Sequence, residues 1–150
     1  MEAQVEKKAL PKKVAAGYAL INIGSTLLLI MTTLLTVLIV LAFTVAFDEL
    51  DFTNPETIAD LVFDFVIALF YIAAAIAGYN YTAHRSFLVW MVGVAAIVFF
   101  VIFIYQSIDF GMRIYQQGFE PFYLVEIGGT ILTQTIYFIG WWISKDYFED

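Results

Sequence analysis

Four long apolar stretches, separated by short polar connections, make up most of this chain. The first and third, residues 14–47 and 87–108, contain no charged side chain. Because a hydrocarbon core of about 30 Å is crossed by roughly 20 helical residues, each stretch is long enough to span a membrane. None of them alternates polar and apolar positions with the period of two that membrane barrel strands show. The pattern therefore predicts transmembrane helices.

The predicted helices are bounded by charged residues and turns. We expect spans over residues 25–47, 58–80, 87–108 and 121–144, within a single membrane domain of residues 1–150. The first apolar stretch exceeds one span, so residues 14–24 are expected to form an interfacial or protruding helical lead-in, softened at Asn22 and Gly24. A cleaved signal peptide is the alternative interpretation, but the apolar region is too long for one.

Composition supports the same fold class. Hydrophobic residues make up 62% of the chain, and its mean hydropathy is +0.86. Soluble domains typically contain about 45–50% apolar residues, so a soluble fold of this size has no interior large enough for this sequence. We therefore expect an all-α integral membrane protein, a bundle of four transmembrane helices.

The distribution of Lys and Arg predicts the orientation, because these residues favour cytoplasmic loops. Six of the seven basic residues fall on the side that holds both termini and the connection between the second and third spans. They are Lys7, Lys8, Lys12, Lys13, Arg85 and Lys145. Only Arg113 falls on the opposite side. The pattern predicts a multi-pass protein with both termini cytoplasmic, most simply in the plasma membrane.

Several kinds of chemistry find no support in the sequence. The chain has no cysteine and a single histidine, His84, which excludes disulfides, thiolate metal sites and a bis-histidine haem within it. No hydrolase, phosphate-loop or metalloprotease motif occurs. The net charge of −7 gives no electrostatic basis for binding nucleic acid. We expect no enzymatic activity, no cofactor and no metal.

Ionisable residues inside a span are functional candidates because charge is costly in lipid. Asp64 and Glu126 lie at similar depth in the second and fourth spans, both of which start from the non-cytoplasmic side. Asp60 precedes Asp64 by one helical turn, and Arg113 with Asp109 lies in the connection outside the third span. These residues form either a cation or proton site or an ion-pair network that joins the helices. Their shallow depth favours the network, since water reaches them there.

Small and polar residues also follow helical faces. In the fourth span the polar face comprises Glu126, Thr130, Thr133, Gln134 and Tyr137. The first span carries a similar band of hydroxyl side chains, and the second contains the small pair Ala74 and Gly78. Such spacing lets helix backbones approach closely, so we interpret these faces as packing surfaces within the bundle. A polar route or ligand groove between the first and fourth helices is the alternative.

These features lead to one preferred function and two alternatives. The preferred hypothesis is a non-catalytic small membrane subunit that stabilises or regulates a larger membrane protein complex, since the loops and tails are too short for an independent soluble activity. The first alternative is a small oligomeric transporter or channel in which Asp64 and Glu126 bind a cation or proton and Gln134 lines the route. The second is a lipid-handling or membrane-shaping protein. Expected partners are the lipid bilayer and either other membrane subunits or copies of the same chain.

Overall fold

The computed structural model describes residues 9–45, 47–49, 51–121, 123–124 and 127–148, and this part of the chain is helical throughout, without a strand. The elements are α1 (Lys12–Val45), the 3₁₀ turn η1 (Phe47–Glu49), α2 (Pro55–Thr82), α3 (Val89–Gln117), the π-helical turn η2 (Ile127–Ile131) and α5 (Leu132–Phe148). Three of the helices, α1, α2 and α3, are long and apolar enough to cross a membrane. The predicted helical membrane protein is confirmed to this extent, whereas α5 has only 17 residues.

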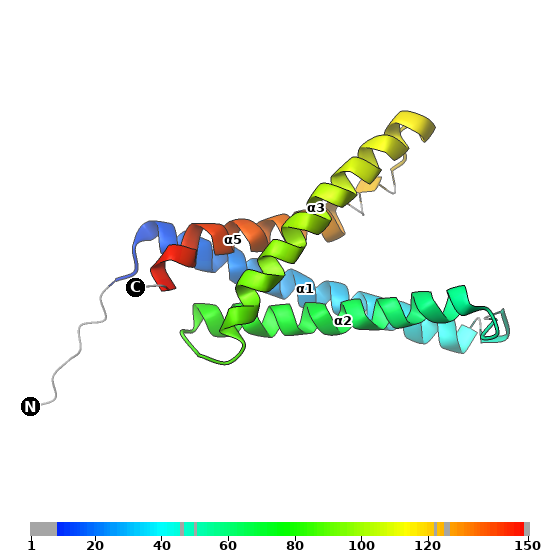
Figure 1. Cartoon of the computed structure of the whole chain (residues 1–150), viewed down its shortest axis with the longest axis horizontal. Helices are drawn as coiled ribbons and strands as arrows, with labels where there is room; N and C mark the ends of the chain where they lie inside the picture. Colours follow the sequence, from blue (N-terminus) through cyan, green and yellow to red (C-terminus); the bar gives the residue numbers. More distant parts are fainter. Residues whose placement is uncertain (1–8, 46, 50, 122, 125–126, 149–150) are drawn as a thin grey trace, which may run out of the picture.

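The helices run up and down in sequence order, as Figure 1 shows. α1 packs against both α2 and α5, and α3 packs against both α2 and α5. The end of the bundle at which α1 and α3 begin and α2 and α5 end is called the closed end. At the opposite end, the open end, α1 and α2 stay together while α3 runs away from them (Figure 1). The bundle is therefore closed at one end only.

Local chemistry explains the limits of α2. Asn54 caps its first turn, since its side chain accepts a hydrogen bond from the amide of Glu56, and Pro55 occupies the first position, where a missing N–H costs nothing. At the other end His84 has φ 54°, and the amide of Arg85 donates to the carbonyl of Asn80 over 2.8 Å. This is a Schellman-type helix end with histidine at the position that glycine usually takes.

α1 and α3 depart from the predicted boundaries. The soft point predicted at Asn22 and Gly24 is wrong, because α1 is one continuous helix. Both residues serve packing instead: the Asn22 side chain accepts a 2.8 Å hydrogen bond from Thr82, and Gly24 lies against Tyr137. α3 continues nine residues past Ile108 and ends only at Gly118, whose φ of 80° suits glycine. The segment after Ile108 was expected to be a connection.

The fourth apolar stretch is not a single α-helix. A π-helical turn, η2, precedes α5, and it includes the adjacent glycines Gly128 and Gly129. Paired glycines have little intrinsic preference for the α-helix, which accounts for the irregular turn at this point. The predicted span of 121–144 is thus divided, and whether this segment crosses the bilayer is taken up as a proposal below.

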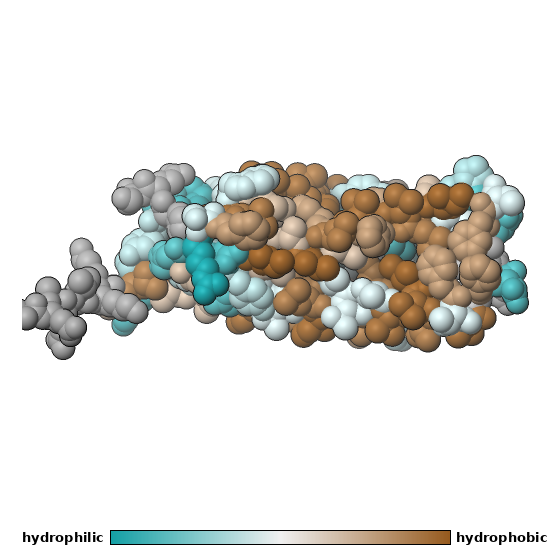
Figure 2. All heavy atoms as spheres, turned by 90° about the horizontal axis from the view of Figure 1, so that it is seen from below, coloured by the Kyte–Doolittle hydropathy of each residue, from teal (hydrophilic) through white to brown (hydrophobic). Residues whose placement is uncertain are grey.

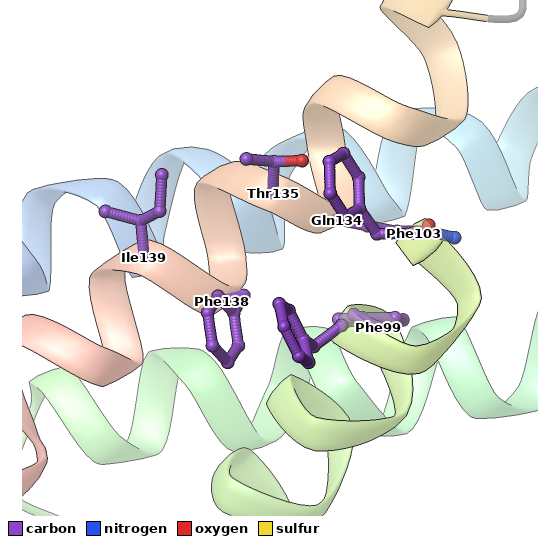
Figure 3. Close-up of a pocket in the computed structure, with 7 residues that line it drawn as sticks. Phe99, Phe103, Gln134, Thr135, Phe138 and Ile139 are labelled. Atoms are coloured by element: carbon purple, nitrogen blue, oxygen red, sulfur yellow. The ribbon is translucent and has the colours of Figure 1, made fainter. Parts of the chain in front are cut away.

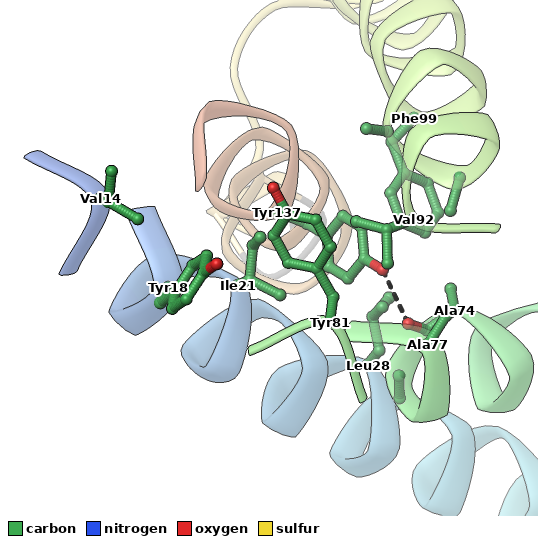
Figure 4. Close-up of a cluster of buried hydrophobic side chains, with 13 residues drawn as sticks. Val14, Tyr18, Ile21, Leu28, Ala74, Ala77, Tyr81, Val92, Phe99 and Tyr137 are labelled. Atoms are coloured by element: carbon green, nitrogen blue, oxygen red, sulfur yellow. Dashed lines mark hydrogen bonds between the residues drawn. The ribbon is translucent and has the colours of Figure 1, made fainter. Parts of the chain in front are cut away.

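The packed core occupies only the half of the molecule near the closed end. On α1 the buried residues other than glycine alternate spacings of four and three, the pattern of a coiled-coil seam. They are Val14, Tyr18, Ile21, Ser25, Leu28 and Thr32. Figure 4 shows how side chains from all four helices meet there. The lead-in at residues 14–24 is therefore the best-packed part of α1.

The half near the open end has a different character. No described side chain in residues 33–45 of α1, 55–67 of α2 or 100–117 of α3 is buried, although most are apolar. On the face shown in Figure 2, apolar atoms cover the middle of the molecule and hydrophilic atoms gather toward its two ends. An apolar middle between polar ends is the distribution that a bilayer requires.

Candidate functional site

The seam between α1 and α5 is built by glycines. A Cβ atom placed on Gly140 would lie 2.8 Å from the carbonyl oxygen of Gly17 and 2.8 Å from the amide nitrogen of Ile21. A Cβ on Gly17 would lie 2.9 Å from the carbonyl oxygen of Gly140. At these distances the two backbones touch directly, as expected for small residues at a helix crossing in a membrane. The polar groove considered between the first and fourth helices has no room at this crossing.

A second close contact joins α1 to α2. A Cβ on Gly78 would collide with the hydroxyl of Ser25 and approach the side chain of Ile21 to 3.0 Å. Ala74, one turn earlier, is fully buried. The packing role predicted for the Ala74–Gly78 pair is thereby confirmed. The Ser25 hydroxyl is enclosed at this contact, and within the described part of the chain it has no hydrogen-bond partner.

Replacing Ser25 with alanine should therefore stabilise the fold. The substitution removes a buried, unpaired hydroxyl from the contact with Gly78, so we expect a gain of about 1 kcal/mol in the free energy of unfolding. Denaturation of the purified protein in mixed detergent micelles measures it. Thr33→Ala is the matched control, because Thr33 is exposed and its hydroxyl bonds to Leu29 of its own helix. Destabilisation by Ser25→Ala alone would show that the hydroxyl has a partner.

α2 and α5 lie diagonally across the bundle and are joined by long side chains. The hydroxyl of Tyr137 donates to the carbonyl oxygen of Ala74 over 2.7 Å, and the hydroxyls of Tyr81 and Ser144 are 3.1 Å apart. The partners in both pairs are 63 residues apart in sequence, so the two helices run parallel and in constant register. Tyrosine hydroxyls thus link α2 and α5, two helices that are not neighbours in the bundle.

Of the five predicted site residues that the structure describes, two lie in direct contact. Arg113 Nε lies 3.0 Å from Asp109 Oδ2, one turn apart on α3, and the guanidinium carbon is 5.5 Å from the centre of the Tyr123 ring. Asp60 is exposed and Asp64 is half-buried, both in the part of α2 near the open end. α2 and α3 diverge toward that end (Figure 1), and among the described residues the ion pair recorded for Arg113 is with Asp109 and not with either of these carboxylates.

The other two predicted residues lie on the fourth stretch. Glu126 is outside the described residues, so its pairing with Asp64 stays a prediction. Gln134 is 2% exposed, and its amide nitrogen is 3.4 Å from the hydroxyl of Tyr71 on α2. Its Oε1 atom has no hydrogen-bond partner in the described part of the chain. Gln134 is therefore a core residue that links α5 to α2.

The threonines expected in a polar route are satisfied by their own helices. Thr32, Thr36 and Thr44 on α1 each donate to the carbonyl four residues earlier, over 2.8–2.9 Å. Thr133 and Thr135 on α5 do the same, over 2.9 and 2.7 Å. A hydroxyl bonded in this way has its proton committed to its own helix.

Sequence reasoning missed Gln106. It is a half-buried residue of α3 near the open end, and its Oε1 atom is enclosed without a hydrogen-bond partner in the described residues. An amide near the end of the uncharged stretch 87–108 was the available signal. Among the described residues there is no group of three or more His, Asp or Glu side chains able to hold a metal ion.

Comparison with protein-family models, with curated proteins and with solved structures finds no match for this chain. Its function must therefore be argued from its own geometry.

Proposed function

We propose that this chain is a four-span membrane protein with cytoplasmic termini, acting as a non-catalytic subunit that docks on a larger membrane protein through its open end. The fourth span would comprise η2 and α5 together with the residues before them. The observation that carries the proposal is the presence of two polar side chains, Asp64 and Gln106, that lie within long apolar helices and lack partners in the described part of the chain.

Polar groups in a span need hydrogen-bond partners because the hydrocarbon core has no water to supply them. Asp64 is the tenth residue of α2, and Gln106 lies in the middle of α3. Asp64 makes no hydrogen bond or ion pair with any described residue, and the same holds for Gln106 Oε1. Lipid tails cannot satisfy either group, and water reaches Asp64 only from the nearby interface. A transmembrane helix that carries hydrogen-bond donors can do so.

The shape of the open end also favours a protein partner. Near the closed end the four helices pack around a common core. Toward the open end, α3 separates from the pair formed by α1 and α2 (Figure 1). The exposed side chains there include large apolar residues such as Leu38, Val62 and Ile104. We infer that the partner is an apolar helix with a Ser, Thr, Asn, Lys or Arg side chain at the depth of Asp64. Its van der Waals packing and hydrogen bonds would supply the association energy.

The test is purification of the tagged full chain from its source membrane in mild detergent, followed by quantification of the proteins that co-elute. We expect a fixed set of larger membrane proteins at constant stoichiometry. The variants Asp64→Asn and Gln106→Leu should each lower their recovery by about tenfold, which corresponds to 1.4 kcal/mol. Asp60→Asn is the matched control, because it makes the same chemical change one turn away at an exposed position.

Two outcomes would contradict the proposal. The first is equal loss of the co-eluting proteins in Asp60→Asn and Asp64→Asn, which would make the effect one of surface charge. The second is a chain that elutes without other proteins, as a defined multiple of 17.0 kDa. In that case the small oligomeric transporter becomes the better hypothesis, and cation or proton flux into vesicles should fall in Asp64→Asn and Glu126→Gln.

A further inference from the structure

The closed end of the bundle carries an exposed basic surface formed by Lys12, Lys13 and Arg85. Lys12 and Lys13 occupy the first turn of α1, and Arg85 lies in the turn between α2 and α3. This turn is held beside α1, because the centre of the His84 ring lies 5.5 Å from the centre of the Tyr18 ring. The three cations therefore belong to one end of the molecule, on the left of Figure 1.

The charge of this basic surface is only partly neutralised by the described residues. Asp146 on α5 lies 2.8 Å from the ammonium group of Lys145 and also interacts electrostatically with Lys13. Lys145 is engaged both by this carboxylate and by an aromatic ring of α5, so it is not counted in the surface. Lys12 and Arg85 form no ion pair within the described part of the chain. The last two residues of the sequence, also acidic, lie outside that part.

The three cations match the depth of a lipid headgroup layer. Arg85 follows the residue that packs on Tyr18, and Lys13 precedes Tyr18 by five residues, roughly 7 Å along a helix that rises about 1.5 Å per residue. The polar layer on each side of the hydrocarbon core is about 5–7 Å thick. The uncharged run of α1 begins directly after Lys13. The basic surface thus covers the thickness of one headgroup layer.

Exposed aromatic rings accompany the cations at the same end. Phe87 and Trp90, just after Arg85, are 65% and 69% exposed, and Trp142 on α5 is also largely exposed. Tryptophan is enriched where hydrocarbon meets headgroups, because its ring is apolar and its N–H is a hydrogen-bond donor. An acidic soluble partner has no use for such rings, whereas a lipid surface contacts both the rings and the cations.

The two ends of the molecule differ in the sign of their charge. Toward the open end the described residues include one base, Arg113, which is paired with Asp109. The other exposed acids there are Asp48, Asp51, Glu56 and Asp60. An anion is therefore attracted to the closed end and repelled from the open end.

We propose that this basic surface binds the phosphate groups of anionic phospholipids in the leaflet around the closed end. In the orientation proposed above this is the cytoplasmic leaflet, whose negative lipids attract lysine and arginine near a span. The Arg85 guanidinium can donate two parallel hydrogen bonds to one phosphate, and the lysines act as point charges beside it. The inference goes beyond the proposed docking function, because it concerns the opposite end of the molecule.

The basic surface is distinct from the apolar hollow between α3 and α5, shown in Figure 3. This hollow has a volume of about 180 Å³, and no charged residue lines it. It therefore offers nothing to a phosphate group. Ile139 borders the hollow and is 41% exposed, so Ile139→Phe alters the contact with acyl chains at an accessible position without changing the charge.

The experiment titrates the delipidated full chain in detergent with phosphatidylglycerol or phosphatidylcholine of identical acyl chains, and counts bound lipids by native mass spectrometry. We expect phosphatidylglycerol to bind more tightly, with a preference that falls as the salt concentration rises. Arg85→Gln should lower its affinity about fivefold, and the double variant Lys12→Gln with Lys13→Gln about tenfold. The affinity for phosphatidylcholine should stay unchanged in both.

Two controls separate this surface from general effects. Arg113→Gln removes the same charge at the open end, and Ile139→Phe alters only the apolar hollow. Neither should change the ratio of the two lipid affinities. A loss in Arg113→Gln equal to that in Arg85→Gln would overturn the proposal, as would an unchanged ratio in the double lysine variant.

Two soluble competitors test the nature of the occupant. Displacement of phosphatidylglycerol by millimolar inorganic phosphate would assign the surface to free phosphate. Tight binding of a polyglutamate peptide, without a preference between the lipids, would assign it to an acidic protein. Either result would overturn the proposal. Co-elution of the docking partner depends on Asp64 and Gln106 toward the open end, so failure of this proposal and failure of the docking proposal are distinguishable.

Discussion

Gly140→Ala should largely unfold the bundle, with a loss of about 3 kcal/mol or more in the free energy of unfolding. The new methyl group would meet the carbonyl oxygen of Gly17 and the amide nitrogen of Ile21, each at 2.8 Å. Both are backbone atoms, so neither moves without shifting α1 as a whole. The α1–α5 contact is the longest seam in the core, and its separation would expose the Tyr137 and Ser144 bridges to α2. Denaturation in mixed detergent micelles measures the loss.

Gly111→Ala is the matched control for this experiment. Gly111 lies in the interior of α3, and apart from the adjoining backbone of its own helix no atom of the described residues lies within 4 Å of its Cβ position. Alanine is about 1 kcal/mol more favourable than glycine in a helix, so this variant should be slightly more stable than the wild type. A Gly140→Ala protein as stable as the Gly111→Ala protein would show that α1 and α5 do not touch as described.

The sequence was sufficient to predict three long apolar helices and part of their packing. Uncharged runs longer than 20 residues specify helices in lipid because no other regular structure satisfies the backbone there. The small pair Ala74 and Gly78 also predicted a close helix contact, and the approach of Ser25 to Gly78, which leaves no room for a Cβ atom, confirms it. In these cases local composition alone determines the outcome.

Long-range geometry could not be predicted in the same way. Asp64 and Arg113 were expected to lie near each other because both fall near the non-cytoplasmic side, but depth alone does not fix lateral position. The direction of α3 is set by the contacts of Phe99 with Phe70, Tyr71 and Tyr137 near the closed end. Those contacts carry α3 away from α2 beyond this point (Figure 1). The segment after Ile108 was misjudged because its charges, paired between Asp109 and Arg113, are compatible with a helix.

The divergence of α3 from α2 and the stacking of Phe100 on Phe138 have a common origin in one cluster of aromatic rings. Phe99 enters the core between α2 and α5, whereas its neighbour Phe100 turns outward and stacks on Phe138. The first contact fixes the crossing of α3 over the bundle, and the second joins α3 to α5 at the same level. The proposed docking surface is thus a consequence of this crossing.

Tyr137→Ala should be the most damaging truncation of a single side chain, costing about 3–5 kcal/mol in the free energy of unfolding. Tyr137 heads the fully buried side chains by volume, and its ring meets Phe99 edge-on at 5.3 Å between centres. Its hydroxyl donates a hydrogen bond to the carbonyl oxygen of Ala74, 2.7 Å away, which Figure 4 marks with a dashed line. Alanine at this position would remove both the packing and the diagonal link between α2 and α5.

Tyr137→Phe separates these two contributions. It keeps the ring and removes only the hydroxyl, and hydrogen bonds between membrane helices are worth about 1 kcal/mol on average, so most of the loss should remain specific to alanine. Tyr115→Ala, at a position that is 92% exposed, is the control for the chemical change itself and should alter the stability little. If phenylalanine proved as damaging as alanine, the α2–α5 diagonal would be held by hydrogen bonding rather than by packing. If alanine cost less than about 1 kcal/mol, Tyr137 would not lie at the centre of the core, and the bundle would have to be packed around a different axis.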